Sequence, residues 1–113
     1  MELKIEVDFS KQVNFQPKGS NPLEALLSAL GGCIGIYADK YLARHSIPYT
    51  KLKVLVTADF TTESPARLVN IVVKVDTDAR LGDKKDIFLR FVHNCPVHNT
   101  LLNTKEIKIY LSV

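Results

Sequence analysis

The sequence predicts an α+β fold with a mainly antiparallel sheet, and three observations lead to this class. Four segments alternate apolar and polar residues with the period of two that half-buried strands show, over residues 2–9, 51–60, 67–75 and 105–113. One long segment after residue 21 has the composition of a buried helix, and residues 82–103 return to helical spacing. Strands and helices do not alternate one by one along the chain, which favours α+β over a parallel α/β sheet.

The length and composition indicate one globular domain spanning residues 1–113. An apolar fraction of 46% with 24% charged residues excludes an intrinsically disordered chain. The longest uncharged stretch, residues 25–38, is shorter than the roughly 18 residues that a bilayer span requires. The first residues alternate charge and apolarity, unlike a signal peptide. We therefore expect a cytoplasmic protein without membrane association, in which a structural disulfide would not persist.

The long helix has a clear start signal. Asn21 suits the N-cap, Pro22 suits the first helical position, and Glu24 sits where a capping box needs its acidic residue. Apolar residues then occupy nearly every side, and Pro48 marks the latest possible end. The pattern predicts a helix that is buried all round.

The length of this helix predicts a homodimer. About 24 residues form a rod of roughly 36 Å, longer than the ~26 Å diameter expected of such a chain. One small sheet covers only one side, so a partner subunit is the simplest cover for the others. Gly31, Gly32 and Gly35 would permit close approach of the symmetry-related helix.

The second half of the chain predicts a hairpin, two short helices and a last strand. Residues 51–60 and 67–75 pair across the turn at 61–65, with Val69, Ile71, Val73 and Val75 facing inward. A helix covers 82–92, and a second begins at Pro96 and ends near Asn103. The last strand, Lys105 to Val113, places Ile107, Ile109, Leu111 and Val113 on one face.

The charge pattern gives no reason to expect nucleic acid as a partner. The net charge is +3, from 15 Lys and Arg against 12 Asp and Glu. These basic residues are spread among acidic neighbours, and the longest basic run is Lys84-Lys85. A nucleic-acid interface concentrates basic residues on one face and adds aromatic side chains for stacking.

Two cysteines are the main candidates for chemistry. Cys95 precedes Pro96, so it is expected at a helix N-cap, where unpaired N–H groups and the helix dipole favour the reactive thiolate. His93 and His98 could add charge there; the alternative is a buried, inert cysteine. Cys33 shares a helix face with Leu30 and Tyr37, which by itself indicates a structural thiol.

Glu24 and a His/Cys cluster are two further candidates for a functional role. Glu24 lies nine residues before Cys33, about 180° away on a continuous helix, so it would serve Cys33 only through a helix bend at Gly31-Gly32 or from another subunit. His93, Cys95 and His98, with Cys33 as a fourth ligand, match no standard zinc spacing. We expect neither a metal nor an organic cofactor.

Two motifs together resemble the OsmC/Ohr family (osmotically inducible protein C and organic hydroperoxide resistance proteins). The segment NPLEALLSALGGC, residues 21–33, is similar to the start of that family's central helix, and CPVHNTL, residues 95–101, is similar to its second cysteine motif. The 62-residue separation of the cysteines also fits. The resemblance implies an intertwined homodimer with active sites at the subunit interface.

The resemblance also implies a cysteine-based peroxidase. Cys33 is similar to the peroxide-attacking cysteine, Cys95 to the resolving cysteine, and Glu24 to an active-site glutamate. We therefore expect an organic hydroperoxide as substrate, a Cys33–Cys95 disulfide within one chain, and a dithiol reductant. The alternative is a dimeric protein of the same fold that binds an apolar ligand or senses redox state without turnover.

One departure from the family motivates that alternative. The family's peroxidases carry an arginine in the N-terminal strands that activates the thiolate and pairs with the glutamate. This chain has no arginine before Cys33. The candidates to replace its charge are Lys18, Arg44, Arg67, Arg80 and Arg90.

Overall fold

The computed structural model describes residues 2–10 and 21–112. In chain order the elements are β1 (Glu2–Asp8), α1 (Pro22–Arg44), β2 (Leu52–Thr61), β3 (Arg67–Thr77), the short 3-10 helix η1 (Gly82–Lys84), α2 (Lys85–Val92) and α3 (Pro96–Asn103). The strands of the described residues form an antiparallel sheet in the order β1-β2-β3. The α+β class and the β2–β3 hairpin are thus confirmed.

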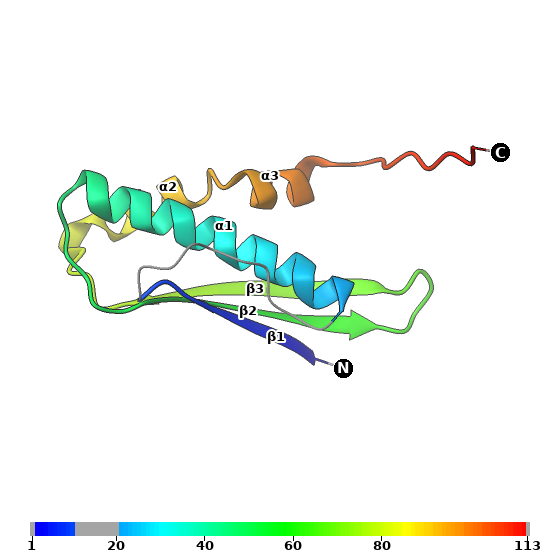
Figure 1. Cartoon of the computed structure of the whole chain (residues 1–113), viewed down its shortest axis with the longest axis horizontal. Helices are drawn as coiled ribbons and strands as arrows, with labels where there is room; N and C mark the ends of the chain where they lie inside the picture. Colours follow the sequence, from blue (N-terminus) through cyan, green and yellow to red (C-terminus); the bar gives the residue numbers. More distant parts are fainter. Residues whose placement is uncertain (1, 11–20, 113) are drawn as a thin grey trace.

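The core lies between the sheet and α1. Alternation places Ile5 and Val7 of β1 opposite Val56 and Val54 of β2, and the same two β2 residues lie opposite Val73 and Val75 of β3. These side chains share the face along which α1 runs (Figure 1). From α1, the buried residues that pack with them include Leu27, Leu30, Ile34 and Ala38.

The start of α1 follows the predicted local chemistry. Asn21 is the N-cap: its Oδ1 accepts a hydrogen bond from Glu24 N at 2.9 Å, and its Nδ2 donates to Glu24 Oε1 at 3.0 Å. The helix then continues without a break to Arg44. Among the described residues, none of the helices combines the length and apolarity needed to cross a bilayer.

Two helix glycines face the chain's own sheet, which corrects their expected role toward a partner helix. A Cβ on Gly31 would lie 3.0 Å from Val56 Cγ2 and 3.3 Å from Val7 Cγ2. A Cβ on Gly35 would lie only 2.1 Å from Cε2 of Phe9, so the Phe9 ring occupies the space that the missing side chain leaves. At these two positions, therefore, glycine lets α1 approach the sheet and Phe9 of its own chain.

A bulge corrects the predicted inward face of β3. The register with β2 shifts between Thr57 and Asp59, and Asn70 adopts a positive φ of 53°. Such an irregularity reverses the facing of the residues beyond it. Leu68, rather than the predicted Val69, therefore packs against the core.

The helices α2 and α3 pack against α1 on the side away from the sheet (Figure 1). Tyr41 of α1 contacts Phe88 of α2 edge-on, with ring centres 5.3 Å apart, and Tyr37 lies 5.7 Å from Phe91. Leu26 and Ile36 remain exposed, so α1 is not buried on every side of a single chain.

The predicted last strand is absent from the described part of its range. Residues 104–112 have no regular structure and extend away from the body of the molecule (Figure 1). A strand needs a neighbour to pair its backbone N–H and C=O groups, and the single chain offers this segment none. Val113, the last residue predicted in it, lies outside the described residues.

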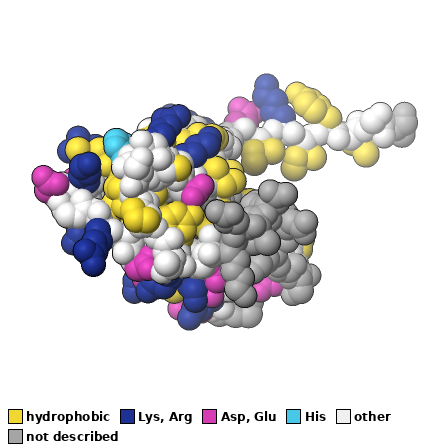
Figure 2. Space-filling view, turned by 60° about the vertical axis from the view of Figure 1, so that its left-hand side comes forward, with side chains coloured by type: hydrophobic (Ala, Val, Ile, Leu, Met, Phe, Trp, Pro, Cys, Tyr) yellow, Lys and Arg dark blue, Asp and Glu magenta, His cyan; other side chains and the backbone are white. Residues whose placement is uncertain are grey.

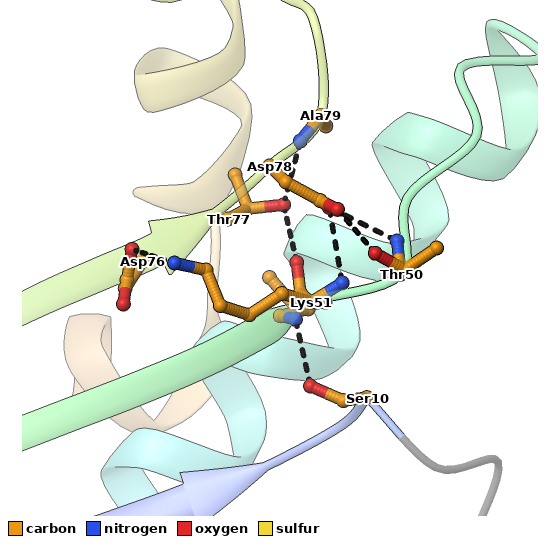
Figure 3. A network of polar contacts seen from close by, with 8 residues as sticks. Ser10, Thr50, Lys51, Asp76, Thr77, Asp78 and Ala79 are labelled. Carbon is orange, nitrogen blue, oxygen red and sulfur yellow. Dashed lines mark hydrogen bonds and ion pairs between the residues drawn. The ribbon is translucent and has the colours of Figure 1, made fainter.

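A polar network fixes the end of the sheet beneath the last turns of α1 (Figure 3). The Asp78 carboxylate accepts hydrogen bonds from the Thr50 hydroxyl and from the backbone N–H groups of Lys51 (3.0 Å) and Thr50 (2.9 Å). Ser10 Oγ accepts from Leu52 N at 3.0 Å. The hydrogen bond from the Thr50 hydroxyl, then those from the two backbone groups, lower the pKa of Asp78 to about 2.

Candidate functional site

The fold brings the two cysteines of one chain together. Cys33 lies half-buried in the middle of α1, and Cys95 is fully buried just before α3, which packs on α1. Both are free thiols, and the Cys33 side chain lies close enough to the Cys95 thiol to raise its pKa. Residues 62 positions apart in the sequence thus present two thiols to each other within a single chain.

The corner between α2 and α3 positions Cys95. Its backbone N–H donates to Val92 O at 3.2 Å, which closes the end of α2, and Pro96 begins α3 as predicted. Its Sγ accepts from His98 N at 3.4 Å, so Cys95 is the N-cap of α3. Asn99 Nδ2 donates to Cys95 O at 3.2 Å. The thiol is therefore held between two short helices and against α1.

The protonation state of Cys95 differs from the expectation based on its cap position. Burial and, to a smaller extent, the neighbouring Cys33 side chain together raise the pKa of the Cys95 thiol to about 11. The hydrogen bond from His98 N acts in the opposite direction but is the smaller effect. Cys95 is therefore a protonated thiol at neutral pH, because desolvation outweighs the helix N-terminus.

A small apolar pocket lies near Cys95, whose sulfur accepts a hydrogen bond from the backbone of the pocket residue His98, although neither cysteine lines the pocket. It has a volume of about 80 Å³ and is lined by Ile34, Val73, Val75, Leu89, Val92, His93 and His98. Ile34 follows Cys33 on α1, and Val92 accepts the hydrogen bond from Cys95 N. The aliphatic lining residues come from three different elements, so the periodicity of the sequence could not predict that they line one pocket.

The two histidines form a contact pair at this pocket. Their rings meet edge-on with centres 5.4 Å apart. His93 Nδ1 lies 2.5 Å from Leu89 O, and His98 Nδ1 lies 3.4 Å from His93 O. A carbonyl oxygen only accepts, so in both rings Nδ1 carries the donated hydrogen. Within residues 2–10 and 21–112, no three His, Cys, Asp or Glu side chains are arranged to hold a metal ion.

Glu24 does not reach Cys33 of its own chain. Nine residues along the uninterrupted α1 correspond to about 13.5 Å of axial rise, and the two residues lie on opposite sides. Glu24 is instead hydrogen-bonded to Asn21 in the first turn. The helix is not interrupted at Gly31-Gly32, so the bend that would bring Glu24 to Cys33 is not observed. A contact between Glu24 of one subunit and Cys33 of another remains a prediction.

None of the contacts described for the candidate arginines is with Cys33. Arg44 is eleven residues beyond Cys33 on α1, about 16 Å along the axis, and its guanidinium lies 5.6 Å from the centre of the Phe91 ring. Arg67 donates to Pro65 O at 2.9 Å beside the hairpin turn. Arg80 and Arg90 are exposed, and Lys18 lies outside the described residues.

Comparison with known proteins identifies the relationship. The pattern of the family described as OsmC-like protein matches residues 15–110 of the chain. Among solved structures, the chain is similar to an OsmC-like hydroperoxide resistance protein from Jannaschia sp. CCS1, with a TM-score of 0.66 and 16% identity. That similarity covers 83% of this chain and 67% of the other and shows a shared fold. No curated protein matches the sequence.

Proposed function

Since the chain belongs to the OsmC-like protein family, we propose that it is a thiol peroxidase that reduces organic hydroperoxides through Cys33 and Cys95. The pairing of the two thiols within one chain is the observation that carries this proposal. The similar solved structure is described as a hydroperoxide resistance protein, which supports the same reaction class.

The first step oxidises Cys33. Its thiolate attacks one oxygen of the hydroperoxide, the O–O bond breaks, and the alkoxide takes up a proton and leaves as the alcohol. The peroxide gains two electrons, and Cys33 becomes a sulfenic acid. Cys33 suits this role better than Cys95 because it is half-buried, whereas Cys95 is completely buried.

The second step forms a disulfide. The Cys95 sulfur attacks the Cys33 sulfenic acid, the new S–S bond forms, and the hydroxyl leaves as water with the proton of the Cys95 thiol. A cellular dithiol then reduces the disulfide by thiol–disulfide exchange and is itself oxidised. The high pKa of Cys95 suits a resolving role, since its protonated, buried thiol does not compete for the peroxide.

The surroundings favour an apolar substrate. The pocket near Cys95 is walled mainly by aliphatic side chains. Such a wall stabilises an alkyl group by burial and offers little to hydrogen peroxide. Because Glu24 does not reach Cys33 of its own chain, it would act on Cys33 of the other subunit in a homodimer.

A coupled assay tests the proposal. Purified protein should oxidise a dithiol in the presence of an organic hydroperoxide, and Cys33→Ser should abolish this oxidation. Cys95→Ser should permit one oxidation per chain and no sustained turnover. On a non-reducing gel, stoichiometric hydroperoxide should give a Cys33–Cys95 peptide in the band of monomer mass.

Other outcomes would point elsewhere. Wild-type turnover no faster than that of Cys33→Ser would refute the enzyme. A disulfide that forms without turnover would favour redox sensing, and a co-purified apolar ligand beside two unreactive thiols would favour a binding protein. A binding protein is the alternative because none of the contacts described for the arginines is with Cys33.

A further inference from the structure

A second pocket lies where α1 ends, and the chemistry proposed above does not use it. It has a volume of about 260 Å³, and its lining includes Phe9, Asp39, Ala43, Ile47, Pro48 and Tyr49. The pocket near Cys95 shares no lining residue with it. Asp39 follows Cys33 by six residues on α1, which turns it roughly 120° away from the cysteine around the helix axis. The second pocket is therefore a separate site.

Backbone hydrogen bonds hold the walls of this pocket in place. Asp39 and Ala43 lie one turn apart near the end of α1. The chain after the helix folds back against it, because Ile47 N donates to Leu42 O at 2.9 Å. Phe9 N donates to Leu52 O at 2.8 Å at the end of β1. The pocket is thus built on the rigid part of the fold.

The Asp39 carboxylate is the charged group of the pocket. It is half-buried, and Tyr49 Oη donates to its Oδ1 at 2.5 Å. Burial first, then this hydrogen bond and the charge of Asp39, raise the pKa of Tyr49 to about 12, so the phenol remains a donor at neutral pH. A carboxylate offers about four acceptor positions. Within residues 2–10 and 21–112, Tyr49 is the only side chain that donates to Asp39, so most of its acceptor capacity is unused.

The basic side chains nearest to Asp39 in the sequence contact other groups. Lys40 Nζ lies 4.9 Å from the centre of the Tyr37 ring. The Arg44 guanidinium lies 5.6 Å from the centre of the Phe91 ring. Among the described residues, therefore, no basic side chain forms an ion pair with the Asp39 carboxylate.

The rest of the pocket suits an organic cation rather than a metal ion. The end of α1 carries the negative end of the helix dipole. Phe9 and Tyr49 supply aromatic rings, which attract ammonium groups, and Ile47 and Pro48 supply aliphatic surface. Figure 2 looks toward this end of the molecule, where hydrophobic side chains are exposed among charged ones. A calcium ion requires about six or more oxygen ligands, and the described part of the chain has no three acidic, His or Cys side chains grouped for a metal.

We propose that this pocket binds a small organic ammonium ion, whose charged head pairs with the Asp39 carboxylate and whose apolar arm packs against Ile47 and Pro48. The size agrees with such a ligand. A cavity of about 150 Å³ holds benzene, so a pocket of about 260 Å³ accommodates a phenyl ring with a short aminoalkyl arm. The site is independent of the two thiols, and the inference does not rest on the peroxidase activity.

Titration with phenethylammonium, followed by amide NMR spectra of the full chain, tests the proposal. The shifted amides should gather at Phe9, Ala43, Ile47 and Tyr49. The matched probes 2-phenylethanol and 3-phenylpropionate carry the same ring and a neutral or negative head, and both should bind at least about tenfold more weakly. Equal binding of the three probes, or no shift of these amides at millimolar phenethylammonium, would overturn the proposal.

Two charge variants test the ion pair. Asp39→Asn keeps the shape of the side chain and an oxygen that can accept from Tyr49, and it should weaken phenethylammonium binding about tenfold or more. Glu63→Gln removes the same charge from the exposed turn at the other end of β2, and binding should stay within about twofold of wild type. If Asp39→Asn binds the probe as tightly as wild type, the proposed ion pair is wrong.

A third variant blocks the pocket without changing its charge. Ala43 is exposed on α1, so Ala43→Leu extends a side chain into the pocket while thermal unfolding should stay close to wild type. Binding of phenethylammonium should fall about tenfold or more, because the apolar arm loses its space. Unchanged binding would show that the probe sits elsewhere. None of these measurements uses a peroxide, so a failed enzyme assay leaves them unaffected.

Discussion

Gly35 provides the sharpest test of how α1 is seated. Replacing it with Ala adds a methyl group whose carbon would lie 2.1, 2.6 and 2.7 Å from three atoms of the Phe9 ring. Ordinary carbon contacts lie at about 3.5–4.0 Å, so the ring must move by more than an ångström or α1 must lift from the sheet. Overpacking of this kind costs about 1–3 kcal/mol.

The net effect follows from two opposing contributions. Alanine in a helix interior is more favourable than glycine by about 1 kcal/mol. With an overpacking cost at the upper end of its range, Gly35→Ala should lose about 2 kcal/mol of unfolding free energy, or roughly 8 °C or more in Tm. Gly31→Ala is the matched control: its methyl would meet Val56 at 3.0 Å, so a small displacement suffices and stability should stay within about 1 kcal/mol of wild type.

Urea unfolding followed by circular dichroism measures both variants, and an unchanged slope would confirm that only stability has changed. Phe9→Leu in the Gly35→Ala background should recover part of the loss, because the smaller side chain frees the space. If Gly35→Ala is as stable as wild type, the seating of Phe9 over this glycine is wrong.

Three further predictions concern single groups. The pKa of Asp78 is lowered to about 2, so its hydrogen bonds contribute stability that is present above its usual pKa of about 4 and is lost as the pH falls toward 2. In acid unfolding, the unfolding free energy of Asp78→Asn should therefore fall less steeply with pH than that of the wild type over this interval. Because burial raises the pKa of Cys95 to about 11, its alkylation by iodoacetamide, followed by peptide mass mapping, should be slow at pH 8 and accelerate toward pH 11; fast alkylation at pH 7 would contradict this. Loss of the N-cap in Asn21→Ala should cost about 1 kcal/mol in thermal unfolding, whereas Asn21→Ser should stay within a few tenths, and equal losses would argue against the cap.

Local signals account for the parts of the fold that could be predicted. Asn21 and Pro22 determine where α1 begins, and Pro96 does the same for α3, because each cap is formed by residues a few positions apart. The β2–β3 pairing followed from alternation. The bulge at Asn70 could not be predicted, because asparagine tolerates positive φ without requiring it, and so Val69 was assigned to the wrong face.

The sequence predicted which residues form the candidate site, but not the pKa of Cys95 or the side chains that line the pocket. The cysteine pair followed from the motif resemblance, and the cap position of Cys95 from Pro96 alone. Its pKa did not follow, because the raising effect comes from α1 and other distant residues that enclose the sulfur. The aliphatic side chains around His93 and His98 come from α1, β3 and α2, and only the tertiary structure brings them together.

The continuous helix α1 fixes the spacing between the two candidate site residues Glu24 and Cys33. Its backbone hydrogen bonds fix Glu24 and Cys33 about 13.5 Å apart along the axis, and no side-chain rearrangement shortens that spacing. If Glu24 acts on Cys33, each active site must combine residues of two subunits, and only the dimer is catalytically competent. A mixed dimer of one Glu24→Gln chain and one Cys33→Ser chain would then hold one centre with both wild-type residues and one with neither, so two defective parents would complement each other.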